Sequence, residues 1–353
     1  MAEKESRKVQ AIHIVLWIVI AALAGVTGYT LRSHPLFERP PRVAVVTGGV
    51  DPFWDIVVAG ARDAADEFEA QLTVHTPGQA EQIELDQNRI LRELIDSQVD
   101  GIAISPISPA TQAPLLNEAA LASRLVTFDS DAAVSQRLCY VGTDNYRAGR
   151  QCGQMVKQAI PDGGKVMISV GSLNAENGQR RRQGLIDELL DRPQGPGRPS
   201  DPLDAPLTGG KYVIQGTLVD KDTRENACEV VLAAIQAHPD VACLVGLYEY
   251  NAPAILDALK KAGKLGQVKV VAFDYHDDTV AAVEAGHIYG TVVQDPYMYG
   301  FTAVRTLTEL ALGRPALPMF QTVLFECSVV KRDDVAAFQA KVKPQLLKAK
   351  GKQ

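Results

Sequence analysis

The chain has 353 residues, of which 46% are hydrophobic and 22% are charged, so it is long enough for two domains of about 150 residues each. Its formal net charge of -6 is small and its Lys and Arg residues are scattered. This distribution excludes the basic surface that a nucleic-acid-binding protein needs, and we expect no nucleic-acid partner.

Residues 1–32 differ in kind from the rest, because basic residues precede an apolar run over 11–26. This order is typical of an export signal or a membrane anchor. Two interpretations stay open: a signal peptide cleaved after the Ala-Leu-Ala of residues 22–24, or an uncleaved single-span anchor. In both, residues 33–41 form a linker, and we expect the remaining chain to be periplasmic or otherwise extracytoplasmic.

After the linker, short β-prone runs alternate with longer helical stretches. The expected strands cover 42–47, 101–105, 125–129, 165–170, 211–219, 241–247 and 268–274, and the expected helices cover 53–70, 111–123, 180–190, 223–238 and 251–263. This alternation predicts an α/β fold with two doubly wound parallel-sheet lobes in tandem, each covered by helices on both faces. The Pro- and Gly-rich residues 191–210 lack periodicity and are expected to form a surface insertion.

Ligands of open parallel sheets bind outside the carboxyl ends of the strands. Two expected strands stop abruptly at an aspartate, in LVTFDSD and in VKVVAFDYHDD. Carboxylates, guanidinium and carboxamide groups can hydrogen-bond the hydroxyls of a sugar or polyol, and aromatic rings can pack on its C–H face. The ligand-binding residues predicted at or near strand ends are Asp51, Phe53, Trp54, Asp129, Asn177, Arg181, Tyr248, Asn251, Asp274 and Gln294.

Alternatives for these residues stay open. Asp129 and Asp274 could cap following helices, and Phe53 and Trp54 could belong to the core. Glu249 is expected at the rim of the site or behind its direct contacts.

Several catalytic and cofactor motifs are absent. The sequence has no G-x-G-x-x-G, no phosphate-binding G-x-x-x-x-G-K-[ST], no G-x-S-x-G and no pair of metal-ligating histidines on one helix. We therefore expect no cofactor, no metal and no enzymatic activity. A glycosidase that uses two aspartates stays open as a minor alternative. The five cysteines, at 139, 152, 228, 243 and 327, are expected to be small buried hydrophobes, with one disulfide still possible.

The order of several motifs resembles that of the periplasmic sugar-binding proteins of the ribose-binding type, the solute receptors of ABC transporters. The motifs are VAVVTGGVDPFWDIVVAGARDAA, LVTFDSD, YVGTDNYRAG, NGQRRRQGL, HPDVACLVGL, NAPAILDAL, VVAFD and GTVVQDPYMYG. The resemblance implies three crossovers between the lobes. It implies a first lobe of 42–143 with 295–323, a second lobe of 144–294 with 324–341, and a tail of 342–353.

The resemblance also implies a function. The protein would close its hinge around a sugar or polyol and deliver it to an ABC transporter permease. Alternatively, held by an uncleaved anchor, it would present its ligand state to a sensor kinase or chemoreceptor. A repressor of similar core would need an N-terminal helix-turn-helix, and an apolar segment occupies that position.

Residue by residue, the resemblance carries ligand contacts to Asp51, Phe53, Trp54, Asp129, Arg181, Asp274 and Gln294. The chain also departs from the family pattern: residue 51 is usually Asn, Ser130 stands where the ribose binder has Arg, and the usual Asn-Asp pair of the second lobe reads Tyr248-Glu249. The pocket is therefore expected to be more acidic than that of a ribose binder.

Overall fold

The computed structural model describes residues 19–20, 39–78, 82–195, 199–315 and 322–351. The predicted export or anchor segment lies outside these residues except for Val19 and Ile20. In the part of the chain that is described, no helix combines the length and the hydrophobicity that crossing a membrane requires. All elements below belong to the unit that begins at Pro41.

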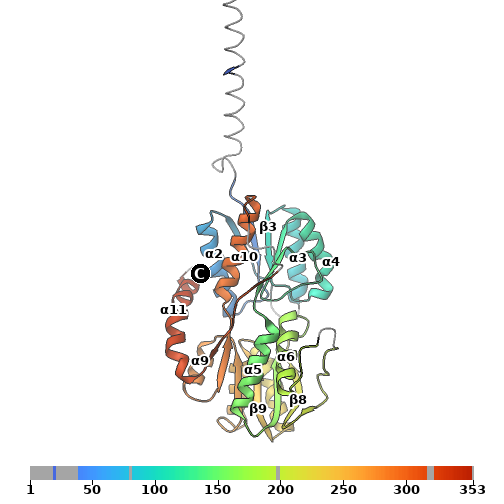
Figure 1. The fold of residues 1–353 in the computed structure, drawn as a ribbon, viewed down its shortest axis with the longest axis vertical. Helices are drawn as coiled ribbons and strands as arrows, with labels where there is room; N and C mark the ends of the chain where they lie inside the picture. Colours follow the sequence, from blue (N-terminus) through green and yellow to red (C-terminus); the bar gives the residue numbers. More distant parts are fainter. Residues whose placement is uncertain (1–18, 21–38, 79–81, 196–198, 316–321, 352–353) are drawn as a thin grey trace, which may run out of the picture. The chain divides into compact units, whose positions relative to one another are not determined.

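Two sheets form the centres of two α/β lobes (Figure 1). The first has the order β12 (Thr322–Leu324), β5 (Cys139–Gly142), β4 (Arg124–Phe128), β3 (Gly101–Ile104), β1 (Arg42–Val46) and β2 (Gln71–His75). The second has the order β13 (Ser328–Val330), β11 (Gly290–Val293), β10 (Lys269–Phe273), β9 (Val241–Gly246), β6 (Gly164–Val170), β8 (Tyr212–Val219) and β7 (Leu207–Gly209). All neighbouring strands are parallel except the edge strands β7 and β13, which pair antiparallel. The predicted pair of doubly wound parallel sheets is confirmed.

Helices cover both faces of the first sheet. They are α2 (Pro52–Glu67) and α10 (Pro296–Ala311) on one face, and α3 (Ile83–Asp96) and α4 (Pro109–Ala122) on the other. The alternation along β1 explains this division, because Val43 and Val45 pack with α2 and α10 while Ala44 and Val46 pack with α3 and α4. Burial on both faces is why this strand reads as a continuous apolar run.

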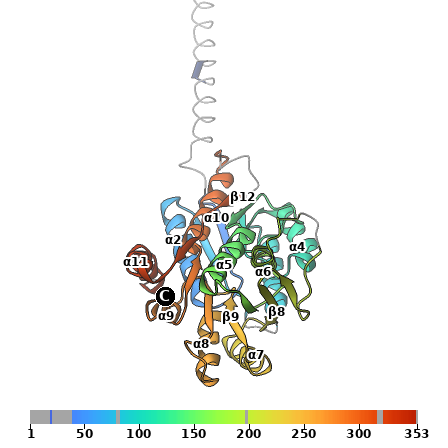
Figure 2. The same ribbon diagram turned by 60° about the horizontal axis from the view of Figure 1, so that its bottom comes forward.

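The second sheet is covered in the same way. On one face lie α5 (Asn145–Ala159) and α6 (Glu176–Leu189), and on the other lie α7 (Arg224–Ala237), α8 (Asn251–Lys261) and α9 (Asp277–Glu284). Figure 2 shows α5 beside α6 and α7 beside α8. Residues 191–195 and 199–210, within the expected insertion, are mostly exposed and contain only the short edge strand β7.

The chain passes between the lobes three times, after β5, after β11 and between β12 and β13. A short 3₁₀ helix, η3 (Arg332–Asp334), then leads into α11 (Val335–Gly351). The start of α11 packs in the core of the second lobe through Phe338, and its end packs through Ala349 on Ile56 and Ala59 of α2. Residues 342–351, which were expected to be a tail, are therefore the second half of a helix that contacts both lobes, because its apolar side chains meet α2.

Candidate functional site

A cavity of about 360 Å³ lies between the two lobes. Eight of the ten predicted ligand-binding residues line it: Asp51, Phe53, Trp54, Asp129, Asn177, Arg181, Tyr248 and Asp274. Its volume falls in the range of small-molecule binding sites, roughly 300–1,000 Å³.

The sheet topology determines where this cavity forms. In the first sheet β1 lies between β2 and β3, and in the second β6 lies between β8 and β9, so the strand order reverses at β1 and at β6. The segments after β1 and β9 supply the lining residues 48–54 and 248–250. The cavity is thus at the carboxyl ends of the strands and at the topological switch points of both lobes, as the rule for open α/β sheets predicts.

The two strand-end aspartates have the same local structure in the two lobes. Asp129 follows β4 with φ of 58°, and Asp274 follows β10 with φ of 64°. Each donates its backbone N–H to the neighbouring strand, to Val141 at 3.0 Å and to Val292 at 2.7 Å respectively. Neither residue caps a helix, so the capping alternative does not hold. The left-handed backbone, which Asp tolerates better than most residues, ends the strand and turns both side chains toward the gap.

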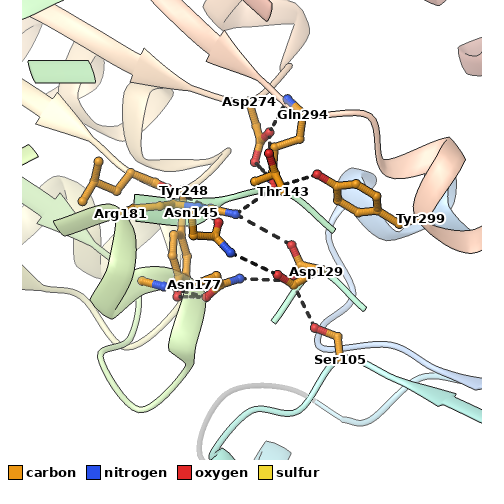
Figure 3. Close-up of polar contacts among 12 residues, drawn as sticks. Ser105, Asp129, Thr143, Asn145, Asn177, Arg181, Tyr248, Asp274, Gln294 and Tyr299 are labelled. Carbon is orange, nitrogen blue, oxygen red and sulfur yellow. Dashed lines mark hydrogen bonds and ion pairs between the residues drawn. The ribbon is translucent and has the colours of Figure 1, made fainter. Parts of the chain in front are cut away.

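Asp129 joins the two lobes (Figure 3). It is only 4% exposed, and its Oδ2 accepts hydrogen bonds from Ser105 Oγ of its own lobe at 3.0 Å and from Asn177 Nδ2 of the second lobe at 3.1 Å. Arg181 Nη2 lies 3.7 Å from Asp129 Oδ1. These contacts therefore hold side chains of α6 against the residue that follows β4.

Arg181 is held by acceptors from three separate segments (Figure 3). Its Nε donates to Asn145 Oδ1 at 2.8 Å, Nη1 to the Leu247 carbonyl at 3.1 Å and Nη2 to Gln294 Oε1 at 3.0 Å. Its guanidinium also lies over the Phe273 ring, 4.1 Å from the centroid. These contacts fix a buried cation that faces both strand-end aspartates.

Two glycines allow α6 to approach α5 closely enough to hold this arginine. A Cβ on Gly149 would lie 2.0 Å from the Arg181 carbonyl oxygen, and one on Gly184 would lie 2.0 Å from the Tyr146 carbonyl oxygen. Only glycine fits at this crossing, and the position of Arg181 depends on it.

The residues after β1 combine core packing with cavity lining. Asp51 is the N-cap of α2, and its Oδ1 accepts the Phe53 N–H at 3.1 Å. Phe53 belongs to the core of the first lobe, and Trp54 packs edge-on against it at 5.0 Å between ring centroids. The core alternative therefore applies to these aromatics in addition to their exposure to the cavity.

Asn251 and Gln294 do not line the cavity. Asn251 is fully buried; its Oδ1 accepts the Tyr248 N–H at 2.9 Å and its Nδ2 donates to Asp220 Oδ2 at 2.7 Å. Gln294 Nε2 donates to Asp274 Oδ2 at 2.9 Å while its Oε1 accepts from Arg181. Both act behind the surface, where they orient the residues that reach it.

Two residues of the site did not appear among the predicted contacts. Asn145 is buried at the start of α5 and orients Arg181. The sequence offered one indication, since Asn145 follows the apolar run of β5. Glu249, expected at the rim or behind the site, is 94% buried and lines the cavity beside Tyr248.

Burial raises the pKa values of three carboxyl groups of the cavity that face one another, those of Asp51, Asp274 and Glu249. Burial, reinforced by the charges of Asp129 and Asp274, raises the pKa of Asp51 to about 7. Burial raises the pKa of Asp274 to about 6 despite the nearby Arg181. Burial, together with Asp51 and Asp274, raises the pKa of Glu249 to about 9. A ligand group that donates hydrogen bonds or carries a positive charge would therefore stabilise the ionised form of each of these carboxyl groups.

Metal and redox features are limited in the described residues. They hold no group of three or more His, Cys, Asp or Glu side chains able to bind a metal ion. The five cysteines all lie within them and are free thiols.

Comparison with known proteins identifies the architecture. Residues 43–315 match the periplasmic binding protein domain. The chain belongs to this family. The family, its two-lobe fold and the sugar-binding character of its members agree with the resemblance noted in the sequence motifs.

Named relatives of this periplasmic binding protein cover most of its length. The ribose import binding protein of Haemophilus influenzae is 26% identical over 77% of this chain and 86% of its own. The D-ribose/D-allose-binding protein of Pseudomonas aeruginosa is 24% identical over 80% and 85%.

Solved structures of similar fold also match this chain over most of its length. A glucose-galactose binding protein from Geobacillus stearothermophilus has a TM-score of 0.75 at 27% identity, covering 84% of this chain and 99% of its own. An ABC transporter solute-binding protein from Burkholderia graminis, in complex with D-arabinose, has a TM-score of 0.73 at 27% identity, covering 84% and 97%.

Proposed function

We propose that this periplasmic binding protein captures a sugar or polyol between its lobes, outside the cytoplasm, and delivers it to an ABC transporter permease. The observation that carries the proposal is the convergence of Asp129 and Asp274, from opposite lobes, on one cavity with Arg181 between them. The names of the relatives, which bind ribose, allose, glucose, galactose or arabinose, support a hydroxyl-rich ligand.

The chemistry of the lining suits such a ligand. Carboxylates accept hydrogen bonds from hydroxyls, and each charge-assisted bond contributes about 1.5–3 kcal/mol net. Trp54 and Tyr248 add flat apolar surface for a C–H face. Four or five such contacts are enough for a micromolar complex, which needs about 8 kcal/mol.

The two lobes and the three connections between them explain how the protein captures a ligand. A ligand that touches both lobes favours the closed arrangement by its differential affinity for it. Asn177, which already donates to Asp129 across the gap, belongs to this closed arrangement. The joined surface of the two lobes is what a permease would recognise.

The test is a thermal-shift screen of the protein against pentoses, hexoses and polyols. A true ligand at a hundred times its dissociation constant adds about 2.7 kcal/mol of stability. Asp129→Asn and Asp274→Asn each weaken that ligand by about 2–5 kcal/mol, because each breaks a buried charged contact. The exposed Asp162, outside the cavity, provides the control Asp162→Asn. Absence of a shift with every sugar and polyol would refute the proposal.

A further inference from the structure

The charges around the cavity do not balance. Six carboxylates line it, Asp51, Asp129, Asp222, Glu225, Glu249 and Asp274, against two guanidinium groups, Arg181 and Arg224. Arg224 is already paired outside the cavity, with Asp257 at 2.8 Å and Asp278 at 3.2 Å. Arg181 is shared between Asp129 and Asp274. Asp51 and Glu249, which belong to opposite lobes and interact electrostatically, are left without a guanidinium of their own.

Glu249 is the most informative of these groups. Its side chain is 6% exposed, and its Oε1 has no hydrogen-bond partner in the described part of the chain. The nearest basic atom is His276 Nε2, at 4.0 Å. Burial lowers the pKa of His276, so this imidazole is neutral at pH 7. A buried carboxylate without a partner is costly, and Glu249 is one of the residues that line the cavity.

The charged groups facing Glu249 come from four segments. Asp51 lies at the start of α2, Asp274 follows β10, Asp277 lies in the first turn of α9, and Arg224 begins α7. Three of these four are acidic, so acidic side chains outnumber basic ones at this end of the cavity.

We propose that the natural ligand is an amino sugar or amino polyol whose protonated amine lies at the end of the cavity formed by Asp51 and Glu249. This inference rests on the proposed function and specifies its ligand class. The ammonium group would neutralise the two carboxylates and donate hydrogen bonds to both. The hydroxyls would contact Asp129, Asp274 and Arg181. Trp54 and Tyr248, next to the two acidic residues, add aromatic faces that also attract a cation.

Isothermal titration calorimetry with matched ligands tests this inference. The pairs are D-glucosamine with D-glucose, D-galactosamine with D-galactose, and D-mannosamine with D-mannose, and each N-acetyl derivative serves as an uncharged control. We expect at least one amine to bind about tenfold or more tightly than its neutral counterpart at pH 7, since a close buried charge pair contributes strongly to affinity. Titration in two buffers of different ionisation enthalpy should show net proton release with the amine only, because a bound cation lowers the pKa of the carboxyl groups.

Variants separate the charge from the shape of the site. Glu249→Gln and Asp51→Asn keep the side-chain size, and each should weaken binding of the amine by a larger factor than binding of its neutral counterpart, so that most of the preference is lost. Glu229→Gln, an exposed position on α7 outside this cavity, should keep the preference. Neutral sugars that bind as tightly as their amines would overturn this inference and leave the proposed function standing. Binding of neither class would overturn both.

Discussion

The substitution Arg181→Lys keeps the positive charge of the site but removes the planar guanidinium group that donates hydrogen bonds in several directions. Three acceptors depend on the guanidinium, namely Asn145 Oδ1, the Leu247 carbonyl and Gln294 Oε1, at 2.8–3.1 Å. A lysine ammonium is a single compact donor group that cannot reach three acceptors in different directions. At least two of them are left unsatisfied and buried.

The expected cost follows from those two acceptors. Each of the two lost buried hydrogen bonds costs about 1–3 kcal/mol, so we expect the ligand-free protein to lose about 2–6 kcal/mol of its unfolding free energy. That loss corresponds to a decrease of roughly 4–12 °C in the midpoint of thermal unfolding. Sugar binding should also weaken, because Asp129 and Asp274 lose their fixed cationic partner.

Differential scanning calorimetry of the ligand-free protein, followed by titration with the ligand found in the screen, measures both effects. The neighbouring Arg180 provides a matched control, since its side chain is 44% exposed and forms an ion pair with Glu176 at 3.5 Å on the protein surface. Arg180→Lys should change stability by no more than about 0.5 kcal/mol. If Arg181→Lys unfolds at the same temperature as the wild type and binds equally well, the site depends on charge alone and the reasoning is wrong.

Three further predictions concern residues in the cavity wall and behind it. Asn251→Ala should lower stability by about 2 kcal/mol, because two buried hydrogen bonds are lost, including that to Asp220, while leaving measurable ligand affinity. The ligand-free protein should lose stability as the pH rises from 4.5 through about 9, because native Glu249 retains a proton that the unfolded chain releases. The variant Glu249→Gln should show a weaker dependence of stability on pH. Gly149→Ala should reduce both stability, by about 1–3 kcal/mol, and ligand affinity, because the new Cβ pushes on the backbone of Arg181.

Each of these three predictions has an outcome that would contradict it. Loss of all binding in a stably folded Asn251→Ala would give that residue a direct contact with the ligand. A melting temperature that is constant or rises between pH 4.5 and about 9 would show that the buried Glu249 carboxyl group does not retain its proton. Wild-type affinity in Gly149→Ala would show that α6 can shift without moving its arginine.

The sequence by itself determined the fold class and identified eight of the residues that line the cavity. The strands that end before Asp129 and Asp274 are mostly apolar because they are buried on both faces, and each is followed by an aspartate where the sheet ends. Since the carboxyl ends of parallel strands share one edge, residues such as Asp129 and Asp274 could be assigned to a common site without coordinates.

Only the tertiary structure decided which polar residues reach the cavity and which act behind it. Asn251 and Glu249 lie two positions apart, yet Asn251 is turned inward by Asp220, 31 positions earlier in the chain, while Glu249 faces Asp51 of the other lobe. The role of residues 342–351 likewise depends on apolar side chains of α2, nearly 300 positions away. Burial and hydrogen-bond partners are properties of contacts between distant segments, and local sequence patterns do not contain them.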